Sequence, residues 1–362
     1  MATVALKNIN GLELTVQDRE LVVLAGPPGS GPSVIIRMIA GLEKISQGDI
    51  LLDERCINDL PPKDRDVGFL SHDYMPYPGM SVYRNVAIGL ERRKFADIEI
   101  RKRVANVTET LGLQDHVAAD PGGLSAEQRR LVGLARVMVR QPKVYLFDEP
   151  FGKLDRGIAI RGRAALAELR QRSSATMLYA TSDPMEALAF SARTVVMEGG
   201  VVQQDDEAQA VFDDPANLFV AKFFGEPAMN LVHGILRQER DGIMFSETGE
   251  GTIAIRLPAS HFGAAAGLVS QPVVLGFRPD AVKITSSPGH KERPGATFRA
   301  LVERSESRGT ETDLYLRTGA HELVCRTCDL AEGGGHRFQF EIDLEKVRLF
   351  EAASGRRLTG AT

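Results

Sequence analysis

A glycine-rich loop is the first stretch of the chain whose residues could do chemistry. Its sequence is Gly26-Pro27-Pro28-Gly29-Ser30-Gly31-Pro32-Ser33. In the pattern G-x-x-x-x-G-K-[ST], backbone N–H groups cradle phosphates at a helix N-terminus, the lysine reaches the outer phosphates and the hydroxyl binds Mg²⁺. Pro32 stands in place of the lysine, so the loop lacks a cation and a backbone donor. The spacing predicts a phosphate-binding loop that has lost part of its chemistry.

Two carboxylates and a capping pattern mark further candidate positions. The apolar run 144–147 predicts a buried strand that ends in Asp148 and Glu149. The carboxyl end of such a strand is where α/β proteins place metal and catalytic groups. Ser125 is followed three residues later by Gln128, which is a capping box, so we expect a helix to begin there.

Strands and helices alternate around these residues. Residues 21–25 predict a buried strand before the loop, and residues 34–40 predict a helix after it. Strands that alternate with helices favour a mostly parallel sheet. We therefore predict an α/β nucleotide-binding domain of the P-loop NTPase class over residues 1–226, with a helical subdomain at about 75–138.

The character of the sequence changes near Pro227. Downstream, short alternating apolar segments such as 253–257, 273–277 and 338–342 are separated by turns that contain glycine and proline. This pattern is typical of a small β-barrel. Residues 227–362 are therefore predicted to form an all-β, OB-like domain.

Composition limits the classes of function. The 362 residues are 43% hydrophobic and 25% charged, which indicates a globular protein long enough for two or more domains. A net charge of -4 gives no basic field, so nucleic acid is not expected as a partner. No apolar window approaches the length of a bilayer span, so we expect a cytoplasmic protein. Cys325 and Cys328 form a CxxC without a second Cys/His pair at zinc-site spacing, which favours two ordinary strand residues.

The order of the motifs identifies a family. Besides the loop, they are Leu124-Ser125-x-x-Gln128, the segment 144–149, Leu154-Asp155, Thr181-x-Asp183, and the C-terminal segments 276–280 and 309–312. The chain resembles the ATP-binding subunits of ABC importers, most closely the carbohydrate-import branch with a C-terminal TOBE/OB-like regulatory domain. The resemblance covers nearly the whole chain, and the joint pattern is far more specific than any single motif.

The resemblance implies roles for these residues with ATP and Mg²⁺ as cofactors. The nucleotide loop would extend from Gly26 to Val34, with Ser33 and Asp148 facing Mg²⁺ and Glu149 polarising the attacking water. In a dimer, Ser125-Ala126-Glu127-Gln128 would face the nucleotide held by the opposite subunit, beside Asp155. Residues 72–90 would receive a helix of a membrane permease, which places the protein on the inner face of the cell membrane.

The departures from the family pattern concentrate on the phosphates. Pro32 replaces the lysine, and His72 replaces a glutamine that senses the γ-phosphate and Mg²⁺. Ala126 and Glu127 replace two glycines, and Ser182 replaces a histidine that contacts the γ-phosphate. No aromatic residue occurs before Phe69, so the ring that should stack on adenine is missing.

Several functions remain open from the sequence. One is a working ATPase of a sugar or related small-solute importer with weakened turnover, which the retained Asp148 and Glu149 favour. Another is a degenerate, non-hydrolytic subunit that binds nucleotide poorly and pairs with or regulates an intact paralogue. The number of independent losses favours this second function, because a homodimer would be defective on both faces of its composite sites. A gene that has drifted without function is a third alternative.

Overall fold

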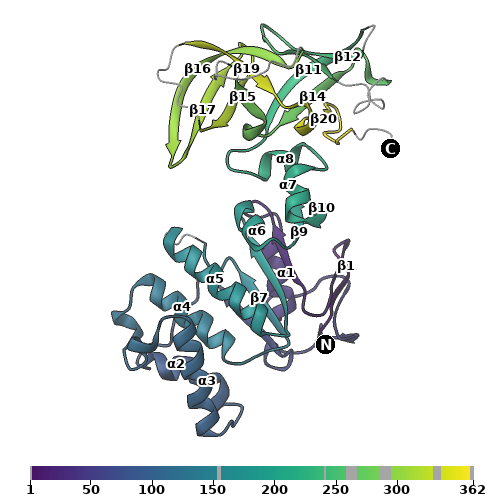
Figure 1. Cartoon of the computed structure of the whole chain (residues 1–362). Coiled ribbons are helices and arrows are strands. Elements are labelled where there is room, and N and C mark those ends of the chain that lie inside the picture. Colours follow the sequence, from purple (N-terminus) through teal and green to yellow (C-terminus); the bar gives the residue numbers. More distant parts are fainter. Residues whose placement is uncertain are drawn as a thin grey trace. The chain divides into compact units, whose positions relative to one another are not determined.

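The computed structural model describes residues 2–152, 156–239, 242–257, 267–285, 295–328 and 336–358 (Figure 1). The chain divides into two compact units, Met1–Ala208 and Gln209–Thr362. The boundary predicted from the sequence lies further along, at 226/227, so the structure groups the segment 209–226 with the second unit. Among the described helices, none is both long and apolar enough to cross a bilayer.

The first unit is built on a six-stranded sheet in the order β10-β9-β3-β8-β7-β6. Only β10 is antiparallel to its neighbour, so the predicted, mostly parallel sheet is confirmed. The strands are β3 (Leu21–Ala25), β6 (Val67–Ser71), β7 (Val144–Asp148), β8 (Thr176–Thr181), β9 (Arg193–Glu198) and β10 (Val201–Glu207). Every residue of β3, β7 and β8 is buried, which is expected of strands covered on both faces.

A small antiparallel sheet, in the order β2-β1-β4-β5, completes the strands of this unit. Its strands are β1 (Val4–Ile9), β2 (Leu12–Val16), β4 (Asp49–Leu52) and β5 (Arg55–Cys56). Asn10 and Gly11 join β1 to β2 with left-handed φ values of 51° and 88°. Because this is a two-residue turn, there is no loop between the strands to carry an aromatic side chain.

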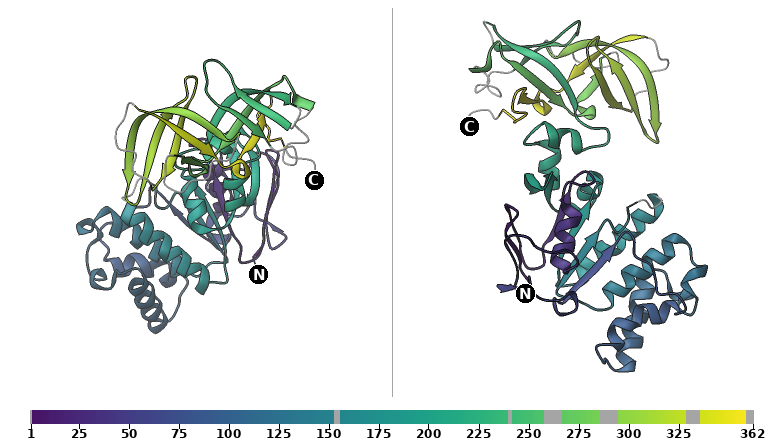
Figure 2. Two further views of the ribbon diagram at one scale, coloured as in Figure 1. Left: turned by 45° about the horizontal axis from the view of Figure 1, so that its top comes forward. Right: turned by 180° about the vertical axis from the view of Figure 1, so that it is seen from behind.

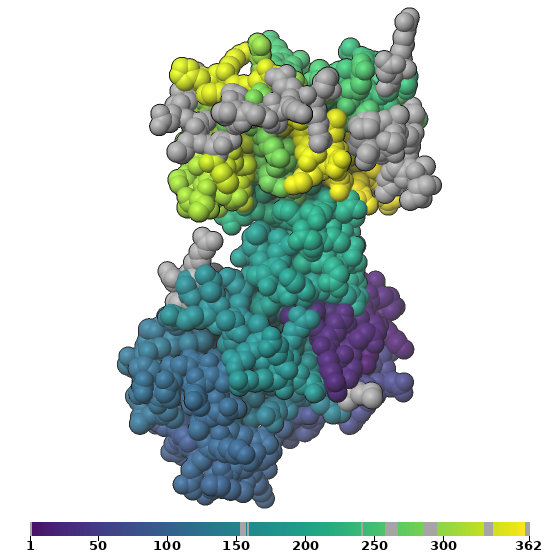
Figure 3. Space-filling view, viewed as in Figure 1, coloured from purple at the N-terminus to yellow at the C-terminus, as the bar shows by residue number. Residues whose placement is uncertain are grey.

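Helices surround the larger sheet. They are α1 (Pro32–Ala40), α2 (Val82–Glu91), α3 (Asp97–Thr110), α4 (Ala126–Met138), α5 (Arg156–Arg172) and α6 (Pro184–Phe190). α2, α3 and α4 pack on one another and lie together beside the sheet (Figures 1 and 2). In the space-filling view these helices form one continuous blue surface at the side of the unit (Figure 3).

The second unit begins with two short helices and continues as two five-stranded sheets. The helices are α7 (Ala208–Asp213), whose first residue ends the first unit, and α8 (Leu218–Phe223). One sheet contains β13 (Ala254–Leu257), β12 (Gly242–Glu247), β11 (Asn230–Glu239), β14 (Pro272–Phe277) and β20 (Arg348–Glu351). The other contains β15 (Val282–Ile284), β19 (Arg337–Ile342), β16 (Thr297–Arg308), β17 (Glu311–Arg317) and β18 (Glu322–Thr327). Their facing side chains share one apolar core.

A buried arginine explains why the segment 209–226 belongs with the β-sheets. The Arg278 guanidinium lies 4.0 Å from the Phe212 ring centroid and donates from Nε to the Phe212 carbonyl at 3.1 Å. It also donates to the carbonyl of Phe224. Burial lowers the pKa of Arg278 to about 10. These contacts join α7 and the end of α8 to the strand end at β14, a link that local sequence patterns do not reveal.

Candidate functional site

The glycine-rich loop joins β3 to α1 as predicted. Gly31 is the N-cap of α1, and its φ of 117° is a value that non-glycine residues rarely adopt. Gly26 lies so close to Ser30 that a Cβ atom at residue 26 would approach the Ser30 Oγ to 2.2 Å. The loop is therefore closed over itself at the N-terminus of a helix, the arrangement that binds anions through backbone N–H groups.

Pro32 is the first residue of α1 and is buried. Its ring suits the first turn of a helix, where the N–H that proline lacks would have no partner within the helix. The next residues supply the Ser33 hydroxyl and the exposed, apolar Val34 side chain. An anion at this end of the helix could contact backbone N–H groups and one hydroxyl, but no lysine.

Asp148 and Glu149 follow one another at the carboxyl end of β7. The Asp148 side chain is 1% exposed, and its Oδ2 accepts a hydrogen bond from the Arg37 Nε at 3.0 Å. Its Oδ1 is buried without a hydrogen-bond partner. Glu149 is partly exposed and has a left-handed φ of 45°. Only Asp148 therefore carries a carboxylate that is both buried and half satisfied.

His72 lies directly beside Asp148. Its backbone N–H donates to the Asp148 carbonyl at 2.9 Å, because β6 and β7 are parallel neighbours with Ser71 opposite Asp148. The His72 Nδ1 is also buried without a partner, as is the hydroxyl of Tyr74. Within the described ranges, all the unsatisfied buried side-chain atoms fall on this strand edge and the loop after it. Such atoms indicate a place where water or a ligand completes the site.

The helix N-terminus at Ser125 forms the predicted capping box. The Ser125 Oγ accepts from the Gln128 backbone N–H at 3.1 Å, and the Gln128 Oε1 accepts from the Ser125 N–H at 3.0 Å. Glu127 forms an ion pair with Arg161 of α5, and its side chain is 20% exposed. The Glu127 carboxylate is thus paired within its own chain.

Comparison with known proteins assigns the family. The family model described as ABC transporter matches residues 9–152, and the model described as MalK OB fold domain matches residues 225–282. The chain is 36% identical over 347 residues to the uncharacterized ABC transporter ATP-binding protein YurJ of Bacillus subtilis, covering 95% of this chain and 93% of that protein. This chain belongs to the ABC transporter ATP-binding proteins.

Two other relatives also match this ABC protein over almost its whole length. The oligosaccharides import ATP-binding protein MsmX of Bacillus subtilis is 34% identical over 97% of this chain and 94% of its own length. The sn-glycerol-3-phosphate import ATP-binding protein UgpC of Bordetella avium is 35% identical over the same shares. The crystal structure of the ATP-binding cassette MJ1267 in its ADP conformation matches with a TM-score of 0.53 at 22% identity, covering 59% of this chain and 96% of that one. This structural similarity to MJ1267 supports the assignment of the fold.

Of the remaining predicted site residues of this ABC protein, some lie near Asp148 and one lies outside the described residues. Ser182 is partly exposed and follows β8, at the same carboxyl edge of the sheet as Asp148. Asp183 caps α6 by accepting from the Met185 N–H at 2.8 Å. Asp155 lies outside the described residues. The predicted positions from β3, β6, β7 and β8 therefore share one edge, as the parallel order requires.

Two charged residues near this edge, Arg37 and Glu186, were not predicted from the sequence. Arg37 could have been noticed, because it lies one helical turn after Ser33 and so on the same face of α1. Glu186 of α6 is buried and accepts hydrogen bonds from the Tyr179 hydroxyl at 2.9 Å and the Thr181 hydroxyl at 2.6 Å. Burial raises the pKa of Glu186. No local pattern marked this carboxylate as buried.

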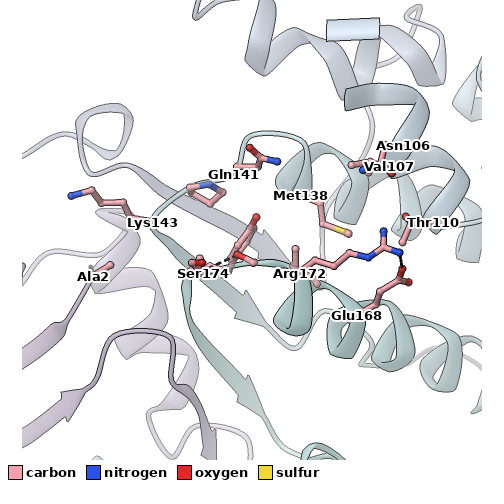
Figure 4. A pocket seen from close by; sticks show the side chains of 15 residues that line it. Ala2, Asn106, Val107, Thr110, Met138, Gln141, Lys143, Glu168, Arg172 and Ser174 are labelled. Carbon is pink, nitrogen blue, oxygen red and sulfur yellow. Dashed lines mark hydrogen bonds and ion pairs between the residues drawn. The ribbon is translucent and has the colours of Figure 1, made fainter. Parts of the chain in front are cut away.

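A cavity of about 400 Å³ lies at the opposite ends of these strands (Figure 4). It is lined where β7 and β8 begin, by residues such as Lys143 and Ser174, and by the last turn of α5 at Arg172. Lys143 is paired with Asp53 at 3.0 Å and Arg172 with Glu168 at 2.6 Å. The cavity contains none of the predicted nucleotide-site residues, and the two cations in its lining are both paired within the chain.

Proposed function

We propose that this ABC protein is the ATP-binding subunit of an importer for sugars or related small solutes, and that its ATP hydrolysis is impaired. One observation carries the impairment: Pro32 begins α1 where the loop needs a lysine, and the nearby guanidinium of Arg37 is bonded to Asp148. The names of the relatives MsmX and UgpC, both import proteins, support the transport part.

The size of the defect follows from the missing charge. A charge-assisted hydrogen bond contributes about 1.5–3 kcal/mol, and a lysine at this position reaches two phosphates. Its loss therefore removes about 3–6 kcal/mol of transition-state stabilisation, equivalent to roughly a hundredfold to ten-thousandfold in rate. Glu149 can still accept a proton, but without positioned phosphates it has little to act on.

The residues present fit Mg²⁺ only in part. Ser33 and the free Oδ1 of Asp148 are oxygen donors of the kind that Mg²⁺ prefers, and they would hold the ion, which supplies positive charge to the transferring phosphoryl group. The Oδ2 of Asp148 is occupied by Arg37, and the imidazole of His72 is a nitrogen donor. The donor set thus differs from one built for Mg²⁺ alone.

The proposed partners are permease subunits in the membrane. The segment 72–90 contains Met75 and Tyr77, two large hydrophobic side chains that are exposed on the loop before α2. An exposed apolar pair of this kind suits a helix of a membrane subunit. The protein would then lie on the cytoplasmic face of the membrane as a homodimer or as a heterodimer with another ATP-binding subunit.

A second candidate function is that of a non-hydrolytic partner for an intact paralogue. The ion pair between Glu127 and Arg161 favours it, because the pair neutralises the carboxylate that would otherwise repel a phosphate at the N-terminus of α4. The capping box at Ser125 keeps that helix end in place. This chain could therefore face a partner's nucleotide even though its own loop is defective.

Phosphate release from ATP by the purified chain tests the proposed function. In Mg²⁺ or Mn²⁺ we expect a rate that does not exceed background, and Glu149→Gln should leave that rate unchanged because the remaining intrinsic turnover is too slow to be resolved from it. Pro32→Lys alone should not restore activity, since His72, Glu127 and Ser182 remain. Turnover at a rate typical of ABC ATPases, abolished by Glu149→Gln, would overturn the proposal.

Co-purification with an intact paralogue distinguishes the second candidate. We expect a heterodimer in which photo-crosslinked ATP labels only the partner. Arg161→Ala should reduce the partner's turnover, because Glu127 is then left unpaired at the shared site, whereas Arg172→Ala, far along the same helix, should not. Recovery of homodimers alone would count against the pairing.

A further inference from the structure

A further cavity of the first unit, of about 680 Å³, is lined by α5, by α6 and by strands of the larger sheet. The strands β3, β7 and β8 supply its floor through apolar and aromatic side chains that are at most 6% exposed, namely Leu21, Phe147, Met177 and Tyr179. The end of α6 adds Phe190, whose ring packs edge-on against Tyr179 with ring centroids 4.9 Å apart. The volume is that of a small-molecule site, and a ligand in it would bury an apolar body.

One face of α5 forms the wall of this cavity. The lining residues of that helix recur at helical spacing, and they include Ile160, Arg163, Ala164, Ala167, Arg170 and Gln171. From the first to the last of them the helix rises roughly 16 Å. Two alanines occupy the middle of the face, so no long side chain fills the space between this part of α5 and the sheet. The cavity therefore follows the helix over about three turns and suits an elongated ligand.

The two cations of the wall differ in their partners. The Arg163 Nη1 lies 3.5 Å from the Glu186 Oε1, so this guanidinium faces a carboxylate. Arg170 is exposed and has no hydrogen bond or ion pair with any residue that the structure describes. No described residue of the lining carries a carboxylate. The cavity therefore has an uncompensated positive charge at its Arg170 end.

The cavity of Figure 4 differs in this respect. Its cations Lys143 and Arg172 are each paired with a carboxylate, at 3.0 Å and 2.6 Å. An anion would have to displace one of those carboxylates before it could bind there. Arg170 requires no such exchange, because its guanidinium is already open to a carboxylate in bidentate geometry.

We propose that the cavity between α5 and the sheet binds a single-chain amphiphile with an anionic head, of the free fatty acid class. The chain lies over the apolar floor, and the carboxylate pairs with Arg170. The head does not lie at Arg163, because Glu186 beside that guanidinium would repel a second carboxylate. The site is separate from the nucleotide loop, so the inference goes beyond the proposed function and does not rest on it.

Equilibrium dialysis of the full chain against radiolabelled laurate, below the concentration at which laurate forms micelles, tests the proposal. We expect a single laurate per chain. Ala167→Phe, at an exposed position in the middle of the wall, should weaken binding roughly tenfold or more, because the ring occupies the space of the acyl chain. Arg170→Glu should weaken it at least as much, since repulsion replaces a charge-assisted hydrogen bond. Arg170→Lys keeps the charge and should bind laurate more tightly than Arg170→Glu.

Two controls separate the site from general charge effects. Arg172→Glu makes the same charge change on α5 but lies outside the lining of this cavity, so it should bind laurate as the unmodified chain does. Dodecyltrimethylammonium, which has a chain of the same length and a cationic head, should not displace laurate. A matching circular dichroism spectrum for each variant shows that it folds.

Several results would overturn the inference. Equal laurate binding by Ala167→Phe and the unmodified chain would place the ligand elsewhere. Equal losses in Arg170→Glu and Arg172→Glu would show an effect of net charge alone. Uptake of many laurate molecules per chain, unchanged by every substitution, would show adsorption without a site. The dialysis contains no nucleotide, so its outcome and that of the ATPase assay are independent.

Discussion

Two buried carboxylates in this ABC protein differ in how completely they are hydrogen-bonded. Asp148, at the end of β7, has one oxygen bonded to Arg37 and one oxygen with no partner. Glu247, at the end of β12 in the second unit, is just as buried but has both oxygens bonded. A fully bonded buried carboxylate supports a fold, whereas a half-bonded one marks a place where something else is meant to bind.

The bonds of Glu247 come from three directions. Its Oε1 accepts from the Thr318 hydroxyl at 2.6 Å and lies 2.6 Å from the His321 Nδ1, and its Oε2 accepts from the Ile253 N–H at 2.9 Å. The Nε2 of His321 in turn accepts from the His233 N–H at 3.1 Å. This carboxylate therefore joins separate parts of the β-domain into one polar network, and it leaves no atom for a ligand.

Removing Glu247 should have the largest effect on stability. Glu247→Ala leaves a hydroxyl, an imidazole and a backbone N–H buried without their acceptor, so we expect the free energy of unfolding of the second unit to fall by about 3 kcal/mol or more. Calorimetry of the full chain measures this as a lower melting temperature for the second unit. Glu250→Ala, at an exposed position nearby in sequence, is the matched control. Equal effects of both substitutions would contradict the structural role of Glu247.

Replacing Asp148 should have a far smaller effect on stability. Asp148→Asn removes a charge that is only half satisfied, and the Arg37 side chain, 37% exposed, can be hydrated when it loses its partner. We expect the free energy of unfolding of the first unit to change by no more than about 1 kcal/mol, in either direction. Urea denaturation followed by the first unit's transition measures it. A loss as large as that for Glu247→Ala would show that Asp148 supports the fold, and the comparison would then fail.

Local patterns predicted the parts of the site that depend on neighbours in sequence. The capping box at Ser125 and the strand ending at Asp148 were found because each is set by a few adjacent residues. The glycine-rich loop before α1 was found in the same way. The common edge of the sheet followed from the alternation of strands and helices, because parallel strands bring their carboxyl ends together.

The unpredicted features depend on contacts between distant residues. Arg37 meets Asp148 across 111 positions of sequence, and Arg278 reaches Phe212 across 66. The ion pair of Glu127 with Arg161 crosses between two helices. Long side chains can reach any of several elements, and only the packed structure decides which one they meet. For this reason the sequence alone does not reveal that Glu127 is paired with Arg161.

A third buried carboxylate, Glu186, lies between the two extremes and should show the smallest effect. Burial raises its pKa, the hydroxyls of Thr181 and Tyr179 and the nearby Arg163 oppose that rise, and Asp183 adds to it. Because the folded-state pKa is above the unfolded value of about 4.3, the folded chain binds more protons in between. The contribution of Glu186 to stability is therefore full below about pH 4.3 and is lost as the pH rises through the raised pKa.

Glu186→Gln should remove this dependence while keeping a group of similar shape. We expect the melting temperature of the first unit to rise relative to the unmodified chain as the pH increases from about 4.3 towards 8, and the difference to level off once Glu186 is ionised. Paired thermal scans across this range measure it. If the melting temperatures of the two proteins change in parallel with pH, the hydroxyl bonds outweigh burial in their effect on the pKa of Glu186. Glu186 would then be a satisfied carboxylate like Glu247, and Asp148 would stand alone among the three.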